Sequence, residues 1–391
     1  MQQVYVIEAL RTPQGSFGGA FADIEAPQLA STVIRELLCR SGLPAHAIDE
    51  VIIGQVLSGG CGQAPARQAM RLAGLPDTTH AMTINKVCGS GLKALMLGAG
   101  SICLGDANVV IAGGMENMSQ APYLLKNGRY GYRMGNGELL DLMICDGLQD
   151  PYSSQHMGVI AEASTEKFGL TKAEQDAFAL RSYQRAQTAI KEGFFATEIV
   201  PVVKKTRKGE EIVAVDEEPF KVSFDKLPTL RPVFKTDGTI TAGNASTIND
   251  GAALSLLAGG VAIEKYGLAP KARLVASASN SIHPDQFAEA PIGAIERVCA
   301  KAKLKIEEID LFEINEAFAA VPLLAIKQLR LDPERVNVNG GAVAIGHPLG
   351  ASGARLVATL VRELHRRQAR YGLVTLCIGG GEAVAAIFER V

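Results

Sequence analysis

The chain repeats itself at a spacing of slightly more than 260 residues. Ala47–Val56 resembles Glu308–Ala317, which lies 261 residues further on, and each segment opens an apolar run with an Ile-Asp pair. The helix-like segments that follow start near Ser90 and Ser352, which are 262 residues apart, and the glycine pairs beyond them are 266 residues apart. Nearly equal offsets in three places indicate that two related halves make up most of the chain.

Both halves alternate strand-like and helix-like segments. This alternation predicts an α/β fold with a mostly parallel sheet and right-handed crossovers. Between the halves, residues 119–248 are richer in Tyr, Lys, Asp and Pro. This insertion has helical patterns at 158–168 and 172–192, and a β-hairpin signal around Lys208 and Gly209. We expect the insertion to form a lid or ligand-binding unit over the sheets.

Composition and charge exclude several classes of protein. Across 391 residues, 39 Lys and Arg face 41 Asp and Glu, so no strong basic field indicates nucleic-acid binding. The seven cysteines are scattered without a Cys-x-x-Cys pair, which argues against a disulfide framework and a zinc site, and no other metal site is expected. The chain shows no presequence, and we expect no apolar stretch of membrane-span length. These features predict a cytoplasmic enzyme without membrane contact.

Cys88 stands in a glycine-flanked turn, "KVCGSG", directly before a segment whose apolar residues recur every three or four positions. At a helix start, unpaired N–H groups and the helix dipole favour the thiolate form of cysteine. The alternative is a small hydrophobic residue that fills a gap, because free cysteine is among the most buried residue types. The local sequence leaves both interpretations open.

The second half carries polar residues where its strands are predicted to end. His347 lies in the glycine-rich segment "NVNGGAVAIGHPLGASGAR", and Cys377 closes an apolar strand before three glycines. Asn315 follows another predicted strand, and its neighbour Glu316 is expected to support it. A phosphate loop fits the His347 segment less well, because Gly-x-Gly-x-x-Gly spacing is absent and no Lys-Ser/Thr pair follows. Ligands of α/β sheets bind at the carboxyl ends of strands, so these residues and Cys88 are expected to share one site.

Seven motifs together resemble the thiolase family over the whole chain, and within it the short-chain acetyl-CoA acetyltransferases: "NKVCGSGLKA", "GGMENMS", "TAGNAS", "NDGAAL", "NEAFA", "GGAVAIGHPLGASGAR" and "CIGGGEA". The resemblance implies a duplicated thiolase fold of five layers (α-β-α-β-α) with an inserted loop domain. The N-terminal half is then residues 1–118 and 249–269, and the C-terminal half is residues 270–391. The loop domain, residues 119–248, would bind coenzyme A and serve oligomerisation.

Joining two acyl thioesters suits a cysteine nucleophile, because the acyl-enzyme is itself a thioester. The resemblance assigns this role to Cys88, with His347 as its base. It assigns to Cys377 the removal of the α-proton from a second acetyl-CoA. Asn315, through a water molecule, and His347 would stabilise the enolate, while the N–H groups of Cys88 and Gly379 would stabilise the oxyanion of the acyl-enzyme.

Coenzyme A and acetyl-CoA are expected as substrates, with no permanently bound cofactor. Two positions depart from the family pattern. Lys221 is the nearest cation where relatives place an arginine near the adenine, so a planar stacking group becomes a point charge. Phe287 stands where many short-chain relatives carry methionine, which bears on the width of the acyl pocket. By resemblance, the substrate contacts are Leu148, His156, Met157, Lys221, Phe234, Ser246, Phe287, Ala317 and Phe318.

Three other functions compete with an acetyl-CoA acetyltransferase. The first is a 3-ketoacyl-CoA thiolase of broader range, as in fatty acid β-oxidation or aromatic degradation. The second is a decarboxylating condensing enzyme on the same duplicated fold, and Cys377 argues against it because those enzymes lack a cysteine there. The third is an inactive scaffold subunit, which the filled catalytic positions disfavour.

The stretch Gly131–Leu148 resembles the loop that joins dimers into tetramers in short-chain acetyltransferases. Leaving its apolar residues exposed on a monomer would be costly. Alternatively, these residues pack onto their own loop domain. A homodimer is the expected minimum and a homotetramer, a dimer of dimers, is the expected assembly; the apolar residues concerned are Leu139, Leu140, Leu142, Met143 and Ile144.

Overall fold

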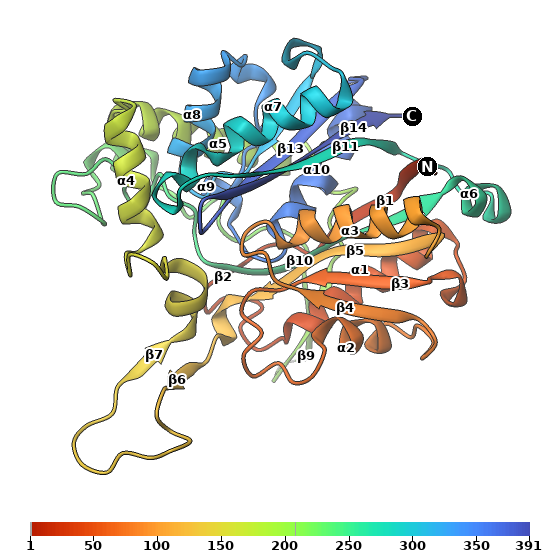
Figure 1. Ribbon diagram of the computed structural model, residues 1–391, viewed down its shortest axis with the longest axis horizontal. Helices are drawn as coiled ribbons and strands as arrows, with labels where there is room; N and C mark the ends of the chain where they lie inside the picture. Colours follow the sequence, from red (N-terminus) through yellow and green to blue (C-terminus); the bar gives the residue numbers. More distant parts are fainter. Residues whose placement is uncertain (1, 208) are drawn as a thin grey trace.

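The computed structural model describes residues 2–207 and 209–391, and within them ten strands form one continuous sheet. The strands are β1 (Val4–Arg11), β2 (Gly15–Ser16), β3 (Glu50–Gly54), β4 (His80–Ile84), β5 (Val109–Asn117), β10 (Asn249–Gly259), β11 (Ala272–Ser281), β12 (Leu311–Ile314), β13 (Tyr371–Ile378) and β14 (Glu382–Arg390). Their order is β12-β13-β14-β11-β1-β10-β5-β3-β4, with β2 beside β10. The two halves of the chain join where β1 pairs with β11 (Figure 1).

The direction of the strands corrects the prediction of a mostly parallel sheet. Parallel pairing occurs at the two ends of the sheet, between β12 and β13 and between β3 and each of β4 and β5. In the centre of the sheet, neighbouring strands are antiparallel: β5 to β10, β10 to β1, β1 to β11, and β11 to β14. One cause is local, because β13 returns directly as β14 through Gly380 and Gly381, whose φ angles of 90° and 83° suit a tight turn.

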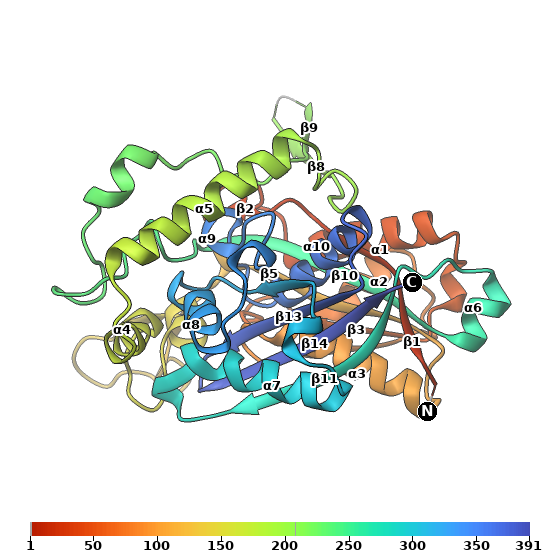
Figure 2. The ribbon, with the colours of Figure 1, turned by 90° about the horizontal axis from the view of Figure 1, so that it is seen from above.

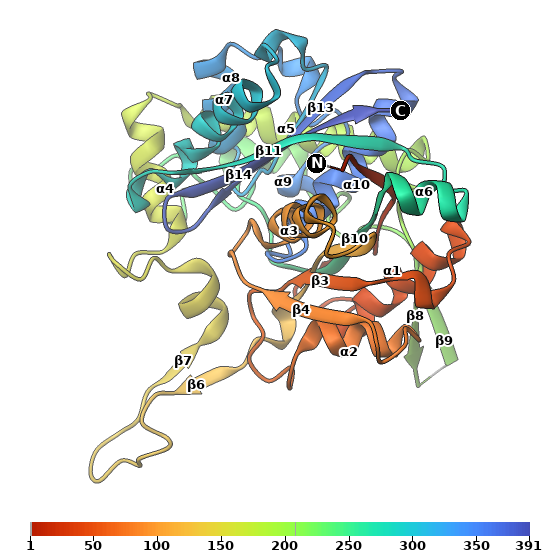
Figure 3. The ribbon, with the colours of Figure 1, turned by 45° about the vertical axis from the view of Figure 1, so that its right-hand side comes forward.

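Helices cover both faces of each half-sheet and give five layers (Figures 1 and 3). Helices α3 and α10 lie together in the middle layer, α1 and α2 cover the outer face of the first half, and α7 and α8 cover the outer face of the second. The helices of the two halves are α1 (Ala26–Ser41), α2 (Pro65–Leu72), α3 (Ser90–Leu104), α6 (Gly260–Tyr266), α7 (Ala290–Ala302), α8 (Ala320–Leu329), α9 (Ala342–Ile345) and α10 (Ser352–Arg366).

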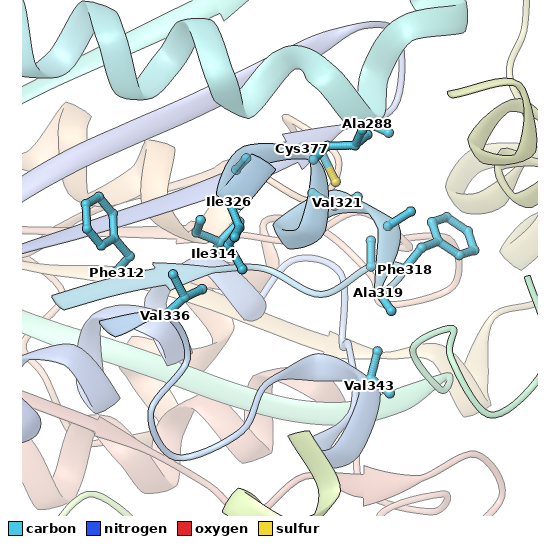
Figure 4. Packing of buried hydrophobic residues seen from close by; sticks show 14 of the residues in the cluster. Ala288, Phe312, Ile314, Phe318, Ala319, Val321, Ile326, Val336, Val343 and Cys377 are labelled. Atoms are coloured by element: carbon cyan, nitrogen blue, oxygen red, sulfur yellow. The ribbon is translucent and has the colours of Figure 1, made fainter. Parts of the chain in front are cut away.

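Alternate residues of each strand serve different layers. In β5, Val110 packs against the middle helices, whereas Ile111 packs against α1 and α2. In the second half, Leu376 faces the middle layer and Cys377 belongs to the cluster under α7 and α8. Figure 4 shows this outer cluster, with the sulfur of Cys377 beside Ala288. Burial of both faces explains the long apolar runs of the strands.

The two repeat-related glycines permit the close contact between α3 and α10. A Cβ on Gly91 would lie 2.9 Å from the backbone nitrogen of Ala354, and a Cβ on Gly353 would lie 2.4 Å from that of Leu92. The contacts are therefore reciprocal across the two halves. No larger residue fits at either position without separating the helices.

The insertion contains β6 (Tyr123–Leu125), β7 (Leu139–Asp141), a π-helical turn η3 (Met143–Leu148), α4 (Met157–Lys167), α5 (Lys172–Lys191), β8 (Val202–Thr206), β9 (Gly209–Val213) and the 3₁₀ segment η4 (Phe224–Thr229). Both predicted helices are confirmed to within one residue at each end. The predicted hairpin is present as β8 and β9, although Lys208 at its tip lies outside the described residues. Helix α5 crosses over α9 (Figure 2).

Residues 123–141, which we call the protruding hairpin, extend away from the body of the protein (Figures 1 and 3). Leu139 is 63% exposed there. Met143, just beyond the hairpin, is buried with Leu57, Met118 and Leu349. The apolar stretch that begins at Leu139 is therefore divided, since one end packs onto the body and the other end is presented to the surroundings.

A buried ion cluster fastens the insertion to the first half. Arg11, at the end of β1, is fully buried, and its Nε donates to Glu198 over 2.6 Å. Its two terminal nitrogens donate to the carboxylate of Asp216 over 2.7 and 2.9 Å. A bidentate pair of this kind fixes orientation as well as charge.

One helical segment is longer and more apolar than the sequence expectation allowed. Val87–Leu104 has 18 residues with a mean hydropathy of 1.5, enough by length and composition to cross a membrane. Half of this segment is buried, and α3 within it lies between the two half-sheets. Its apolar character is accounted for by its place in the core of the duplicated fold.

Candidate active site

Both halves and the insertion contribute side chains to one cavity of about 50 Å³. The turn before α3 supplies Cys88, the loop before α10 supplies His347, and the end of β13 supplies Cys377 with the following glycine. The lining comprises Cys88, Gly147, Leu148, His156, Met157, Ser246, Phe287, Ala317, Phe318, His347, Leu349, Cys377 and Gly379. The sequence predicted most of these residues, but neither Gly147 nor Leu349.

Cys88 lies in a strained turn. Its neighbour Val87 has a φ of 44°, a left-handed conformation that β-branched residues rarely adopt. Ser90, the first residue of α3, holds the turn, since its Oγ accepts from the backbone N–H of Lys86 over 2.8 Å and donates to the carbonyl of Val87 over 2.7 Å. Strain that is held in this way is common where a reactive side chain must face a site.

Desolvation opposes the thiolate form of Cys88, which the position before a helix was expected to favour, although the residue is only partly buried. The surrounding protein raises the pKa of Cys88 to about 12, although hydrogen bonds from the backbone N–H of Gly379 and of Cys88 itself lower the pKa in part. These N–H groups, first that of Gly379 after β13, therefore reduce a desolvation effect that remains larger. Cys88 needs a base to become a nucleophile.

His347 can act as that base. Its ring is almost fully buried, and this burial, assisted by the charge of Arg355, lowers the pKa of His347 to about 3. The imidazole is therefore neutral at physiological pH. Its Nε2 lies 3.3 Å from Nδ2 of Asn315, and its Nδ1 lies 2.5 Å from Oγ of Ser352. The backbone N–H of His347 donates to Oδ1 of Asn249 over 3.0 Å.

Cys377 reaches the cavity from the second half. It is buried at the end of β13, opposite Ala383 of β14. Burial, and then the nearby Cys88, raise the pKa of Cys377 well above that of a free thiol. Two cysteines from different halves thus line one small cavity as thiols, together with a neutral histidine.

Asn315 and Glu316 follow β12, as the sequence predicted, but their side chains have different partners. Asn315 contacts the ring of His347, as described above. The carboxylate of Glu316 accepts from Oγ of Ser182 on α5 over 2.7 Å, from Nδ2 of Asn337 over 2.8 Å and from the N–H of Val343 over 3.1 Å. Glu316 therefore connects the insertion to the loop that carries the base.

Two family models match this chain: the thiolase N-terminal domain over residues 4–260 and the thiolase C-terminal domain over residues 268–390. The chain belongs to the thiolase family. It is 51% identical over 392 aligned residues to an acetyl-CoA acetyltransferase of Pseudomonas aeruginosa, with all of both chains covered. It is 50% identical to an acetyl-CoA acetyltransferase of Chromobacterium violaceum, with 99% of this chain and all of that one covered.

Solved structures also contain this fold. The crystal structure of the Bacillus anthracis acetyl-CoA acetyltransferase matches with a TM-score of 0.98 and 41% identity, over 100% of this chain and 99% of the other. The predicted thiolase fold is therefore confirmed, including the five layers described above. Thiolase chemistry is acyl transfer, so this thiolase is an acyltransferase.

Aromatic rings line and border the thiolase cavity. His156 stacks on Phe234 with ring centroids 4.8 Å apart, and Phe318 meets the edges of Phe234 and Phe287 at 6.0 and 6.3 Å. His156 also caps α4, since its Nδ1 accepts from the N–H of Gly158 over 3.1 Å. His156 therefore both caps α4 and lines the cavity.

Lys221 lies elsewhere in the thiolase. Among the described residues that line the cavity, Lys221 does not occur, and its Nζ contacts Oγ of Ser16 and Oε1 of Glu218. Its predicted contact with the adenine of coenzyme A stays a prediction. Phe234 is likewise outside the lining but borders it through His156.

Sequence reasoning missed three residues that hold the catalytic loops. Ser352 contacts the ring of His347, and Asn249 holds its backbone. Glu116 is buried and accepts from the N–H groups of Val56, Leu57 and Gly350 over 2.8–3.0 Å, so it joins loops of both halves. The motifs "NDGAAL", "GGMENMS" and "GASGAR" contain all three residues, but a motif match does not show what a side chain contacts.

Proposed function

We propose that this thiolase is an acetyl-CoA acetyltransferase, which joins two acetyl-CoA molecules to give acetoacetyl-CoA and coenzyme A, and catalyses the reverse thiolysis. The observation that carries the proposal is the meeting of Cys88, Cys377 and the neutral His347 in one cavity. The names of the relatives from Pseudomonas aeruginosa and Chromobacterium violaceum support the acetyl substrate.

The first half-reaction transfers an acetyl group to Cys88. His347 takes the thiol proton on Nε2, and the sulfur attacks the thioester carbonyl. The resulting oxyanion would be stabilised by the N–H groups of Cys88 and Gly379. When the bond from carbon to the sulfur of coenzyme A breaks, acetyl-Cys88 remains and the thiolate of coenzyme A leaves.

The second half-reaction needs Cys377 as a base, although burial keeps it protonated in the resting protein. The departing thiolate of coenzyme A takes the proton of Cys377, and the imidazolium of His347 favours the thiolate that results. Cys377 then removes the α-proton of a second acetyl-CoA. The enolate, stabilised by His347 and a water molecule on Asn315, attacks acetyl-Cys88 and forms the new carbon–carbon bond. The expelled sulfur of Cys88 recovers its proton from His347.

The cavity favours short acyl groups over the broader range of a general 3-ketoacyl-CoA thiolase. Phe287 is only 2% exposed and its ring meets Phe318 edge to face. A rigid aromatic ring therefore occupies the position where many relatives, by resemblance, carry a flexible methionine. Extending the acyl chain would require both rings to move.

Rates of thiolysis across 3-oxoacyl-CoA substrates of increasing length test the proposal. We expect the highest kcat/KM for acetoacetyl-CoA and a fall of about tenfold or more for six-carbon and longer substrates, as when a small pocket excludes extra methylene groups. Equal rates from four to ten carbons would establish the broader-range thiolase instead. No acyl transfer with any length would contradict both functions.

We further infer that the enzyme forms homotetramers in the cytoplasm, built from dimers that pair along β4. This strand is the last in the sheet order, so one of its edges has unpaired backbone groups, and Met82 on it is 41% exposed. The protruding hairpin would then join two such dimers.

A further inference from the structure

Ser352 stands between the base and the helix that follows it. It is the first residue of α10, it is 1% exposed, and its Oγ lies 2.5 Å from Nδ1 of His347. The same oxygen lies 2.8 Å from the carbonyl of Pro348. On the other side of the ring, Nε2 of His347 faces the side-chain amide nitrogen of Asn315 over 3.3 Å.

The donors and acceptors in this chain of contacts determine where the ring hydrogen of His347 and the hydroxyl hydrogen of Ser352 lie. With the amide nitrogen of Asn315, which can only donate, placed toward the ring, Nε2 of His347 is the bare, accepting nitrogen. A neutral ring then carries its hydrogen on Nδ1 and donates it to Ser352. The single hydrogen of the Ser352 hydroxyl is thereby directed to the carbonyl of Pro348.

The same arrangement suits both states of the base. When Nε2 takes the proton of Cys88, the imidazolium donates from both nitrogens, and Ser352 still accepts from Nδ1 without turning its hydroxyl. In the opposite arrangement, with the hydroxyl donating to Nδ1, Nε2 would carry the hydrogen and could not accept a proton from Cys88. It would also point that hydrogen at the amide of Asn315.

The duplication supports this role independently. Ser90 is the repeat-related serine of the first half, and it holds the Cys88 turn by the same two functions, accepting with Oγ from Lys86 and donating to the carbonyl of Val87. Each half thus uses the first serine of its middle helix to hold the catalytic residue just before that helix. In the first half the serine orients the nucleophile, and in the second half it contacts the base itself.

We propose that Ser352 is the positioning residue of the base, and that by accepting from Nδ1 it holds His347 in the tautomer whose bare Nε2 takes the proton of Cys88. The inference deepens the proposed function, because it concerns the same base. It does not depend on the acyl substrate, since deprotonation of Cys88 can be followed without acetyl-CoA.

Alkylation of Cys88 by iodoacetamide at pH 7 tests the proposal, with the labelled peptide quantified by mass spectrometry because all seven cysteines are free. For Ser352→Ala we expect the rate at Cys88 to fall by about 10²-fold, the lower range for loss of a general base. Ser352→Thr, which retains a hydroxyl, should alkylate within about threefold of the unmodified protein.

Ser31→Ala is the matched control. Ser31 is also a buried serine in the first turns of a helix, and its Oγ donates to the carbonyl of Gln28 over 2.8 Å, away from the cavity. Its variant should alkylate at the unmodified rate. A Ser352→Ala protein that melts cooperatively and alkylates as fast as the Ser31→Ala protein would overturn the proposal.

The tautomer can be read directly in the unmodified protein, so the test does not depend on a variant that folds. Long-range ¹H–¹⁵N spectra of ¹⁵N-histidine protein distinguish protonated from bare ring nitrogens, and comparison with His347→Gln identifies one of six histidines. We expect a protonated Nδ1 and a bare Nε2. A protonated Nε2 would overturn the inference. Slow acetoacetyl-CoA turnover with the expected spectrum would contradict only the proposed function.

Discussion

At the scale of single residues, the chemistry rests on two cysteines whose environments differ from what their positions in the sequence indicate. Cys88 precedes a helix, which favours a thiolate, but burial is the larger effect and raises its pKa to about 12. The sequence predicted the residue types and their meeting in one cavity. It could not predict the degree of desolvation, because residues that are distant along the chain, such as Met157 and Phe318, line the cavity around Cys88.

The roles of the two cysteines can be separated by labelling. Cys88→Ala should abolish both acyl exchange and condensation, because no acyl-enzyme forms. Cys377→Ala should still be acylated at Cys88 but lose condensation by about 10²–10⁴-fold, as expected for loss of a general base. Incubation with radiolabelled acetyl-CoA, followed by an acid quench, measures label on the protein.

Label on Cys377→Ala but not on Cys88→Ala supports the assignment. Cys39→Ala is a suitable control, because Cys39 is exposed on α1 and outside the cavity lining. The reverse pattern, with label only on Cys88→Ala, would mean that the nucleophile and the base are exchanged.

The buried base predicts a specific loss of stability in acid. The pKa of His347 is about 3 in the folded protein and near 6.5 in the unfolded chain. The unfolded state therefore binds the extra proton between these values, so stability is complete above pH 6.5 and decreases as the pH falls toward 3. Between pH 6.5 and 5 the loss from this one group is about 1.5 kcal/mol.

Urea unfolding at the two pH values measures this effect. The difference in unfolding free energy between pH 6.5 and 5 should be smaller for His347→Gln than for the unmodified enzyme, since glutamine does not titrate. An equal difference in both proteins would show that His347 does not titrate far from its ordinary pKa.

At the scale of elements, local signals in the sequence predicted the boundaries of helices correctly. They did not predict how strands that are distant along the chain pair in the sheet. Helix α5 begins with a capping box in which Thr171 and Glu174 bond reciprocally, a signal contained in four consecutive residues. The direction of β10 has no such local signal. It enters the sheet after an insertion of about 130 residues, and its antiparallel pairing with β1 and β5 follows from where the insertion returns the chain.

The crossing of α3 and α10 predicts opposite effects for two glycines of one helix. Gly91→Ala places a Cβ 2.8 Å from the carbonyl oxygen of Gly350 and 2.9 Å from the nitrogen of Ala354, and backbone atoms cannot move aside locally. We expect a loss of about 1–3 kcal/mol in unfolding free energy, the usual range for overpacking.

Gly100→Ala in the same helix is the matched control, because a Cβ there meets nothing within 4 Å. Alanine has a higher helix propensity than glycine, so this substitution should raise the unfolding free energy by up to about 1 kcal/mol. Denaturant unfolding of both variants gives the comparison, and equal stability of the two would contradict the close crossing.

At the scale of the whole molecule, the duplication explains why the site lies between the halves. Each half contributes a serine-initiated middle helix, and a catalytic residue, Cys88 or His347, lies in the turn or loop that leads into it. The repeat was visible in the sequence, so the pairing of the halves and the convergence of Cys88, His347 and Cys377 could be predicted. The contacts of Ser352 and Asn249 could not, since they depend on side-chain directions inside loops that no periodic pattern describes.

The assembly is the remaining prediction at this scale, and the protruding hairpin decides it. Its exposed apolar residues include Met134 at 96% and Leu139 at 63%, a costly surface for an isolated chain.

Light scattering at micromolar concentration should give a mass near four times the 41.3 kDa of one chain. Met134→Glu combined with Leu139→Glu should reduce it to near twice that mass, because charges would be buried between dimers. Val261→Glu, which changes a residue on α6 that is 59% exposed and so comparable with Leu139, should leave the tetramer intact. A dimer in the unmodified protein would contradict the tetramer, and a tetramer in the double variant would show that another surface joins the dimers.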